Sequence, residues 1–347
     1  PPAAPTLDAT PAPAPAVERP QPPARPGLTP DDSMAEVVRK TLWFHFQHML
    51  YHEPGTRLGE DIEELHDMRV AVRRMRTALE VFGPYVTTEQ IAPFARGLRR
   101  TGRLLGAVRD LDVFREKLDR YMAGLPADQP PRLEPLLTAW ETRREEARQN
   151  MLAYLDSRRY RRFTERFGEF LQQPEAGAPS VITAEGGVLP HRVRHVAPAL
   201  IWQRLAAVRA YDGWVGQAGA PLERYHQLRI AFKFLRYTIE YLRELLGGPA
   251  KTLIDEIKVA QDHLGDLQDA VVASQLLRNF LVWETLSAEP PADRRQPATL
   301  IAPGVAAYLA YRQIELQRLL DTFPKMWARI QNREFHKLAL DAVAQLW

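Results

Sequence analysis

Apolar residues recur at every third or fourth position through most of the chain, which is the period of one face of an α-helix. The pattern is clear over 34–50, 132–155 and 261–283, whereas the alternating runs typical of β-strands are scarce. Gly- and Pro-rich stretches at 173–190 and 285–304 interrupt the pattern and predict breaks between helices. We therefore expect an all-α fold.

The N-terminal stretch has a different composition from the rest. Residues 1–28 are rich in Pro and Ala and carry too little apolar surface to form a core, so we expect a disordered, extended linker. A linker that opens on Pro1 favours a further domain upstream in a longer protein. Thr29, Pro30 and Asp32 supply an N-cap, a first-turn proline and a first-turn acid, and they predict the start of the first helix.

The helical part contains an internal repeat. Residues 66–80 (HDMRVAVRRMRTALE) align without gaps on residues 226–240 (HQLRIAFKFLRYTIE). A second pair follows in the same order, because 104–112 and 263–271 share an L-G-x-x-x-D element. Two matched segments in one order indicate a duplicated unit. We expect two pseudo-symmetric helical halves, each resembling a four-helix bundle, at residues 29–180 and 181–347.

One face of the repeated helix is basic in both copies, and we call this face the basic stripe. At about 100° per residue its members fall within an arc of about 80°. Most other positions are apolar, above all in the second copy, so the stripe should line a groove or channel rather than an open surface. Clustered cations there repel one another unless an anion binds. The stripe comprises His66, Arg69, Arg73 and Arg76 in the first copy and His226, Arg229, Lys233 and Arg236 in the second.

The helix after each stripe should add charges to the same groove. Asp110 and Asp269 share its face, and we expect them to be buried and to orient stripe arginines through paired hydrogen bonds. Gly106 and Gly265 are expected to permit close approach of the helices. Asp262 dilutes the second copy, which predicts a more cationic first half. The added cations are Arg96, Arg99 and Arg103 in the first copy and Lys251 and Lys258 in the second.

Composition narrows the class of protein. A chain of 347 residues, 45% of them hydrophobic, can bury a sizeable core. Its formal net charge of only +3 means that attraction for an anion must come from local clustering. The absence of cysteine excludes disulfides and thiol nucleophiles and suits a reducing cytoplasm. Because no apolar run reaches the roughly 18 residues of a membrane span, we expect a soluble, cytoplasmic protein with no membrane partner.

The H-x-x-R-x-x-x-R/K-x-x-R pattern at 66–76 and 226–236, each followed by the L-G-x-x-x-D element, resembles the CHAD domain, the conserved-histidine α-helical domain. The resemblance covers about residues 30–347. It implies two pseudo-symmetric four-helix bundles around a basic groove or pore that binds inorganic polyphosphate without turnover, in the cytoplasm and at polyphosphate granules. It further implies frequent fusion behind a CYTH triphosphatase domain, which fits the expected upstream domain. By resemblance, the eight stripe residues contact phosphate, with help from Arg99, Arg103 and Lys258.

Two other functions use the same residues. The groove could bind a nucleic acid or another acidic partner, although few aromatic side chains accompany the stripes to stack on bases. A phosphohydrolase could use the stripe histidines with Asp110 or Asp269, but no paired-carboxylate metal site supports it. We expect a non-enzymatic binder of polyphosphate, with nucleic acid as the alternative partner.

Two groups of histidines have the helical spacing of metal ligands, namely His45, His48 and His52, and His191 and His195. Neither segment carries an acidic partner within its own H-x-x-H or H-x-x-x-H pattern. We therefore expect these histidines to extend the phosphate groove or to pack, and we expect no metal ion and no cofactor.

Overall fold

The computed structural model describes residues 21–125, 133–215, 217, 219–287 and 303–347. Within that part, ten α-helices, one 3₁₀ turn and two isolated bridges occur and no β-strand does, which confirms the predicted all-α class. None of the helices described there is long and apolar enough to cross a membrane. The elements are α1 (Met34–Leu58), α2 (Ile62–Val81), η1 (Gly83–Tyr85), α3 (Thr88–Ala123), α4 (Glu134–Leu155), α5 (Arg158–Gln172), α6 (Val193–Arg209), α7 (Leu222–Tyr241), α8 (Arg243–Ser287), α10 (Pro303–Gln331) and α11 (Arg333–Ala344).

The predicted break at 173–190 is confirmed, because it lies between α5 and α6. Most of the break at 285–304 lies outside the described residues, as does most of the predicted linker at 1–28. Within α8, Gly247 has φ of 66° and ψ of −157°, a conformation that favours glycine, so the helix is interrupted there.

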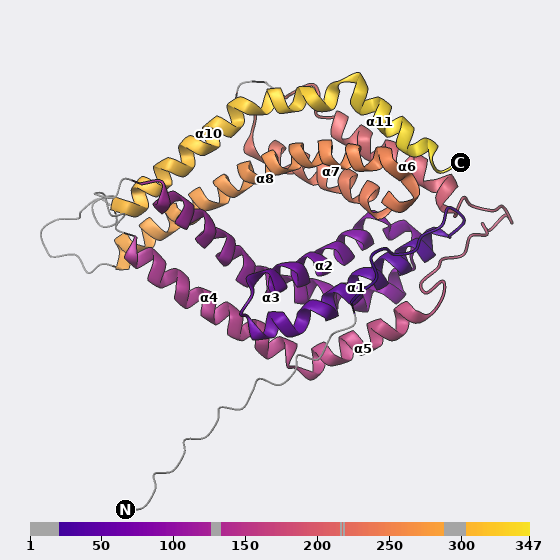
Figure 1. The fold of residues 1–347 in the computed structure, drawn as a ribbon, viewed down its shortest axis with the longest axis horizontal. Helices are drawn as coiled ribbons and strands as arrows, with labels where there is room; N and C mark the ends of the chain where they lie inside the picture. The colour runs from indigo at the N-terminus through magenta and orange to yellow at the C-terminus, as the bar shows by residue number, and fades with distance from the viewer. Residues whose placement is uncertain (1–20, 126–132, 216, 218, 288–302) are drawn as a thin grey trace, which may run out of the picture.

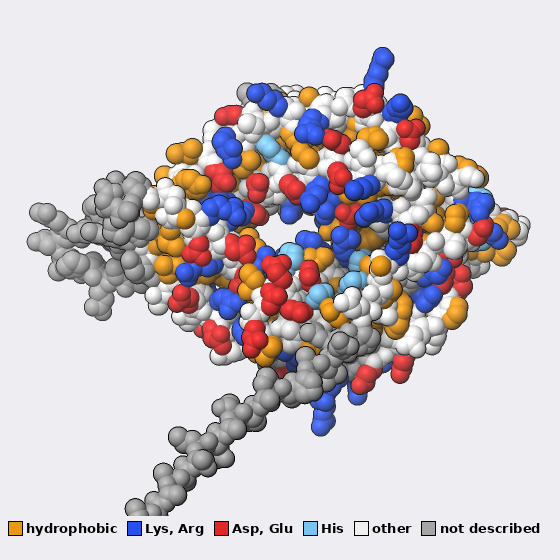
Figure 2. All heavy atoms as spheres, in the orientation of Figure 1, with side chains coloured by type: hydrophobic (Ala, Val, Ile, Leu, Met, Phe, Trp, Pro, Cys, Tyr) orange, Lys and Arg blue, Asp and Glu red, His pale blue; other side chains and the backbone are white. Residues whose placement is uncertain are grey.

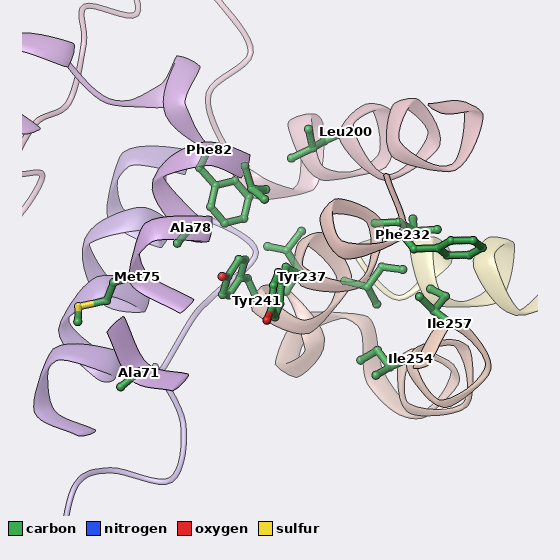
Figure 3. Close-up of a cluster of buried hydrophobic side chains, with 14 of the residues drawn as sticks. Ala71, Met75, Ala78, Phe82, Leu200, Phe232, Tyr237, Tyr241, Ile254 and Ile257 are labelled. Carbon is green, nitrogen blue, oxygen red and sulfur yellow. The ribbon is translucent and has the colours of Figure 1, made fainter. Parts of the chain in front are cut away.

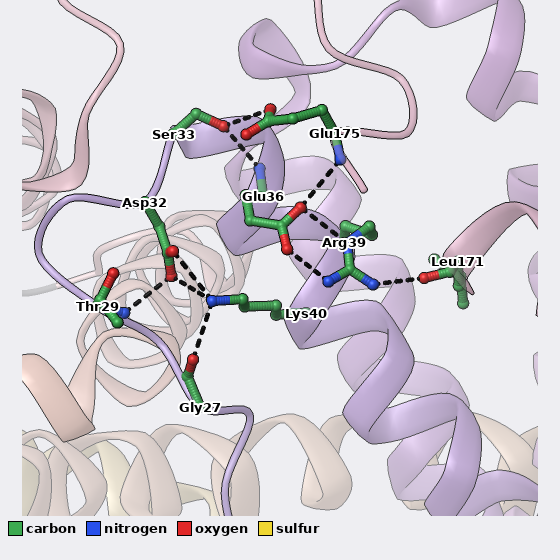
Figure 4. A network of polar contacts seen from close by, with 9 residues as sticks. All are labelled: Gly27, Thr29, Asp32, Ser33, Glu36, Arg39, Lys40, Leu171 and Glu175. Carbon is green, nitrogen blue, oxygen red and sulfur yellow. Dashed lines mark hydrogen bonds and ion pairs between the residues drawn. The ribbon is translucent and has the colours of Figure 1, made fainter. Parts of the chain in front are cut away.

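The first helix begins later than the sequence predicts. Thr29 to Asp32 forms a turn instead, in which the Thr29 amide donates to Asp32 Oδ2 at 2.8 Å. Ser33 is the true N-cap, since its Oγ accepts from the Glu36 amide at 3.0 Å. The same hydroxyl donates to Glu175 at 2.7 Å and fastens α1 to the segment after α5 (Figure 4). The prediction was wrong because two consecutive segments each place an acid three residues after Thr or Ser.

The helices form a ring of two halves (Figure 1). Helices α1 to α5 make one half, and α6, α7, α8, α10 and α11 make the other. The halves touch where α2 packs against α7. On the opposite side of the ring, the far ends of α3 and α4 meet those of α8 and α10. Between these two junctions, α2, α3, α7 and α8 frame a central opening.

The apolar faces of α2 and α7 supply the core at the first junction (Figure 3). The Phe82 ring lies with its centroid 5.6 Å from that of Tyr241. Tyr241 is buried and donates from its hydroxyl to the Arg74 carbonyl oxygen at 2.7 Å, which ties the two helices together. Met75 of α2 is fully buried, and Phe232 is fully buried on another side of α7, where its ring meets that of Trp327 of α10 edge-on at 5.9 Å. Because these faces are committed to the core, the basic stripes must point elsewhere.

A separate apolar cluster closes the ring at the second junction. Phe114 of α3 stacks on Trp140 of α4 with ring centroids 3.8 Å apart. Tyr308 of α10 meets Phe114 edge-on at 6.1 Å, and Leu277 of α8 is buried beside them. Because each half contributes side chains, this cluster holds the ends of the two helical hairpins together.

Candidate functional site

The two basic stripes lie on α2 and α7, and the additional cations lie on α3 and α8. These four helices frame the central opening (Figure 1). The opening persists when all side chains are drawn, and blue Lys and Arg side chains lie around its rim together with red acids and pale-blue histidines (Figure 2). The duplication therefore brings both stripes to one place, as the pattern of the repeat requires.

The first stripe rests against two glycines of α3. A Cβ on Gly102 would lie 3.3 Å from Arg76 Nη1, and a Cβ on Gly106 would lie 3.6 Å from Arg69 Nε. The approach at Gly102 is tight, whereas the distance at Gly106 is that of an ordinary van der Waals contact. The prediction that Gly106 permits close helix approach was wrong, because its nearest neighbour is a guanidinium and not a helix backbone. At Gly265 a Cβ would meet nothing within 4 Å.

The two aspartates differ from their prediction. Asp110 was expected to be buried, but 72% of its side chain is exposed, and it accepts one hydrogen bond from Arg69 Nη2 at 3.0 Å. Its pKa is raised overall: partial desolvation by the surrounding atoms raises it, the charge of Arg69 lowers it, and the nearby Asp269 raises it again. Asp269 is 46% exposed and binds Lys117 of the other half at 2.7 Å rather than a stripe arginine. The L-G-x-x-x-D element fixes helix faces but not the depth of burial.

Residues of the second stripe contact two acids and one amide within the protein. His226 Nδ1 lies 2.9 Å from Gln268 Oε1, so this nitrogen carries a proton and donates. Lys233 Nζ lies 3.5 Å from Glu80 of the first repeat, which is an ion pair across the halves. Arg236 pairs within its own helix with Glu240 at 3.4 Å.

Six of the Arg and Lys residues that were predicted to contact phosphate have no such partner. No carboxylate in the described part of the chain lies within 4 Å of their charged nitrogens, and these six are Arg73, Arg76, Arg99, Arg103, Arg229 and Lys258. The Nε of Arg229 is buried without a hydrogen-bond partner among the described residues. The Arg73 side chain is exposed at its surface, but desolvation by the surrounding atoms lowers its pKa, and the positive charges of Arg69 and Arg236 lower it further. Cations from both repeats thus repel one another at this site.

His66 lies among these charges. Its Nδ1 is buried and has no hydrogen-bond partner among the described residues. Burial lowers the pKa of His66, and the charge of Arg109 lowers it further. An anion placed here would favour the protonated ring, because it would supply the charge partner that the site lacks.

Several residues near the site were not foreseen. Arg74 pairs with Glu240 across the junction at 3.3 Å, and its guanidinium lies 5.9 Å from the centroid of the Tyr237 ring. Its position next to Arg73 was the only sequence signal. Lys117 carried no signal, because its partner comes from the other half of the chain. Arg96 was expected to share the face of Arg99, but it lines a different pocket, between α3 and α5.

Among the histidines outside the stripes, His52 and His191 have polar partners, whereas His48 Nε2 is buried without one among the described residues. His45 is buried, and its pKa lies well below the usual value because of burial and then the charge of Arg74. His52 Nδ1 lies 2.8 Å from Glu64 Oε2. His191 Nδ1 contacts the Leu189 carbonyl oxygen at 3.0 Å. Among the residues that the structure describes, no group of three or more His, Cys, Asp or Glu is placed to hold a metal ion.

Fold and site together define an all-α protein whose helices form a ring around a central opening, with Lys and Arg side chains, acids and histidines on its rim. The model of the CHAD domain matches residues 40–278, and the chain belongs to the CHAD domain family. Two uncharacterized proteins of Mycobacterium tuberculosis, MT2285 and Rv2226, are each 27% identical over 285 residues. The alignment covers 79% of this chain and 48% of each relative, so the chain spans about half their length.

Two solved structures share the fold. The crystal structure of the CHAD domain from the plant Ricinus communis aligns with a TM-score of 0.66 at 23% identity, covering 92% of this chain and 98% of that one. PptA from Streptomyces chartreusis aligns with a TM-score of 0.62 at 16% identity, covering 86% of this chain and 100% of that one. At these identities the likeness concerns the fold alone.

Proposed function

We propose that this protein binds inorganic polyphosphate, without turnover, through the basic stripes at its central opening. The observation that carries the proposal is the set of six cations without a carboxylate partner, drawn from α2, α3, α7 and α8. Grouping them costs free energy through repulsion and desolvation, and a bound polyanion offsets that cost. The CHAD family is related to polyphosphate in general, which supports this choice of anion.

The side chains suit phosphate groups. Arginine offers a planar fork of donors that matches two phosphate oxygens, and lysine adds a compact charge. Arg73 and Arg229 are among the members that we expect to contribute most, because neither has an internal acid to displace. Residues such as Lys233 must first exchange Glu80 for phosphate, so they should contribute less.

The aromatic residue of the second stripe is unsuited to stacking on bases. Tyr237 is 1% exposed, stacks on Tyr241 at 5.8 Å, and has the Arg236 guanidinium 4.8 Å from its ring centroid. The ring is therefore buried and already in contact with two neighbours, so a base cannot reach it. A single-stranded nucleic acid would find charge here but no stacking surface, which favours a ligand without bases.

We further propose that binding places the protein at polyphosphate granules in the cytoplasm, and that a CYTH-like domain precedes this one in a longer chain. Binding would then deliver polyphosphate to that domain or tether it to granules. Co-sedimentation of the protein with granules, compared between the native chain and a variant that cannot bind, tests the targeting.

The test of the proposed function is a titration of long-chain polyphosphate into the whole 347-residue chain, with single-stranded RNA as a competitor. The variant Arg73→Gln with Arg229→Gln removes two cations at the opening. Its matched control is Arg143→Gln with Arg318→Gln, two exposed arginines on the outer helices α4 and α10. We expect tight binding that RNA displaces poorly and that only the first variant weakens. Equal displacement by RNA would indicate a general polyanion groove, and no binding at low salt would refute the proposal.

A further inference from the structure

A second basic pocket lies on another face of α3, away from the stripes. It is formed between α3 and α5, with Tyr154 of α4, and has a volume of about 410 Å³. Figure 1 shows α5 on the outer edge of the ring, whereas Arg99 of α3 lines a different pocket together with Arg76. The six arginines that line the outer pocket are Arg96, Arg100, Arg158, Arg159, Arg162 and Arg166.

No acid among the described residues forms an ion pair with these arginines. The lining residues include no Asp or Glu. Within the described part of the chain, no ion pair within 4 Å joins any of the six arginines to a carboxylate, although Glu165 and Glu169 lie on the same helix. Elsewhere in the molecule exposed arginines do find acids, as Arg115 does with Asp119 at 2.9 Å. Six unanswered guanidinium groups around one hollow repel each other and attract anions.

One of the six is held in place before any ligand arrives. The guanidinium of Arg100 lies 5.1 Å from the centroid of the Tyr154 ring, and its Nε is buried without a hydrogen-bond partner among the described residues. Tyr154 is itself fixed, since its hydroxyl lies 3.2 Å from Thr101 Oγ1. Phe163 packs against Gly97, where a Cβ would lie 2.3 Å from its ring. The pocket therefore has a packed aromatic floor beneath its arginines.

The fold does not require these arginines. Helix α5 begins after the N-cap Ser157, and α11 begins in the same way after Asn332, so the two helices can be aligned from their caps. In that alignment Arg159 corresponds to Glu334 and Arg166 to Asp341. The second half thus builds the same helix with acids at two of these positions, while Arg333 and Lys337 correspond to Arg158 and Arg162.

The first turn of α5 carries a further cost. Arg158 and Arg159 lie there without an acid, so they oppose the positive end of the helix dipole. The aligned turn of α11 contains Glu334, the charge that a helix start prefers. Helix α5 thus carries repulsion at Arg159 and Arg166 that α11 does not carry at the aligned positions. This difference indicates that these arginines serve to bind a ligand rather than to stabilise the fold.

We propose that the pocket between α3 and α5 is a second anion site, which takes a compact group of several phosphates. Arginine forks bind phosphate oxygens in pairs, and a volume of about 410 Å³ suits a small multiply phosphorylated molecule or a short stretch of polyphosphate. Both sources present the same chemistry. The site lies on a different face of α3 from the stripes and does not rest on the function proposed for the central opening.

The test uses two neighbouring charge reversals on α5. Arg162→Glu changes a residue that lines the pocket, and Arg161→Glu changes an exposed residue that does not. Both put an acid near the start of a helix, where it is tolerated. Thermal melting verifies that the variants fold. Inositol hexakisphosphate serves as the probe for a small phosphorylated molecule, and long-chain polyphosphate as the probe for a chain, each titrated into the whole protein at low salt.

We expect Arg162→Glu to weaken binding of at least one probe about tenfold or more, while Arg161→Glu changes it less than about twofold. Loss of inositol hexakisphosphate binding identifies a small phosphorylated ligand. Loss of binding that is confined to long-chain polyphosphate identifies the ligand of this pocket as a stretch of the polyphosphate chain. Unchanged binding of both probes in folded Arg162→Glu overturns the site. The variant Arg73→Gln with Arg229→Gln separates this result from the central opening, because it should leave the outer pocket intact.

Discussion

Replacing Asp110 with asparagine should strengthen polyphosphate binding. Asp110 accepts one hydrogen bond of 3.0 Å from Arg69, and the Asp110 side chain is 72% exposed. The neutral amide would release the guanidinium and remove a negative charge close to the bound phosphates. An acid that only oriented Arg69 would have the opposite effect, since its loss would misplace the arginine.

The magnitude follows from Coulomb's law. A carboxylate about 7 Å from one phosphate in water repels it by about 0.6 kcal/mol, so its removal should raise affinity about threefold. One additional arginine engaged should steepen the log–log salt dependence by about 0.7. The free energy of unfolding should change by less than about 1 kcal/mol, because the ion pair is exposed.

The assay is a polyphosphate titration of Asp110→Asn at several salt concentrations, beside thermal melting. The control is Asp119→Asn on the same helix, which breaks an exposed pair with Arg115 and touches no stripe residue. The control should leave affinity and salt slope unchanged. Weaker binding by a folded Asp110→Asn protein would refute this reasoning and assign Asp110 a positioning role.

Three further predictions rest on single contacts. The pKa of His66 is lowered in the free protein and should rise beside a polyanion. The contribution of His66 to binding is therefore complete below the free-state pKa and is lost as the pH rises through the bound-state pKa. In titrations, affinity should fall between about pH 5 and pH 8, and His66→Asn should flatten that pH dependence. Tyr308→Phe removes a buried hydroxyl without a partner among the described residues and should raise the unfolding free energy by about 1 kcal/mol in a melting experiment, whereas a lower melting temperature would contradict this. Gly102→Leu should displace Arg76 and weaken binding about tenfold, while Gly265→Leu, where a Cβ meets nothing within 4 Å, should bind normally.

The sequence predicts what depends on periodicity and repetition. The all-α class and the break between α5 and α6 are confirmed, because three-and-four spacing and Gly/Pro clusters are local signals. The helices that carry the two stripes, α2 and α7, both border the central opening, and the charge of Arg236 on α7 acts on Arg73 on α2. Whether those residues bind polyphosphate stays a prediction.

Contacts between distant segments could not be predicted in this way. The burial of Asp110 was misjudged because a helix face says nothing of the space in front of it. The true N-cap of α1 was missed because Thr29 and Ser33 each precede an acid by three residues, and the contact of Ser33 with Glu175, far along the chain, leaves no trace in that local pattern. The pairing of Lys117 with Asp269 joins two halves that no local pattern relates.

The salt dependence of polyphosphate affinity tests the central claim most directly. The account predicts that the native chain binds with a steep log–log slope, and that Arg73→Gln with Arg229→Gln reduces this slope by about 1.4, or about 0.7 for each phosphate that the variant no longer engages. A folded variant with the native slope and affinity would contradict it, because the arginines at the opening would then take no part in binding.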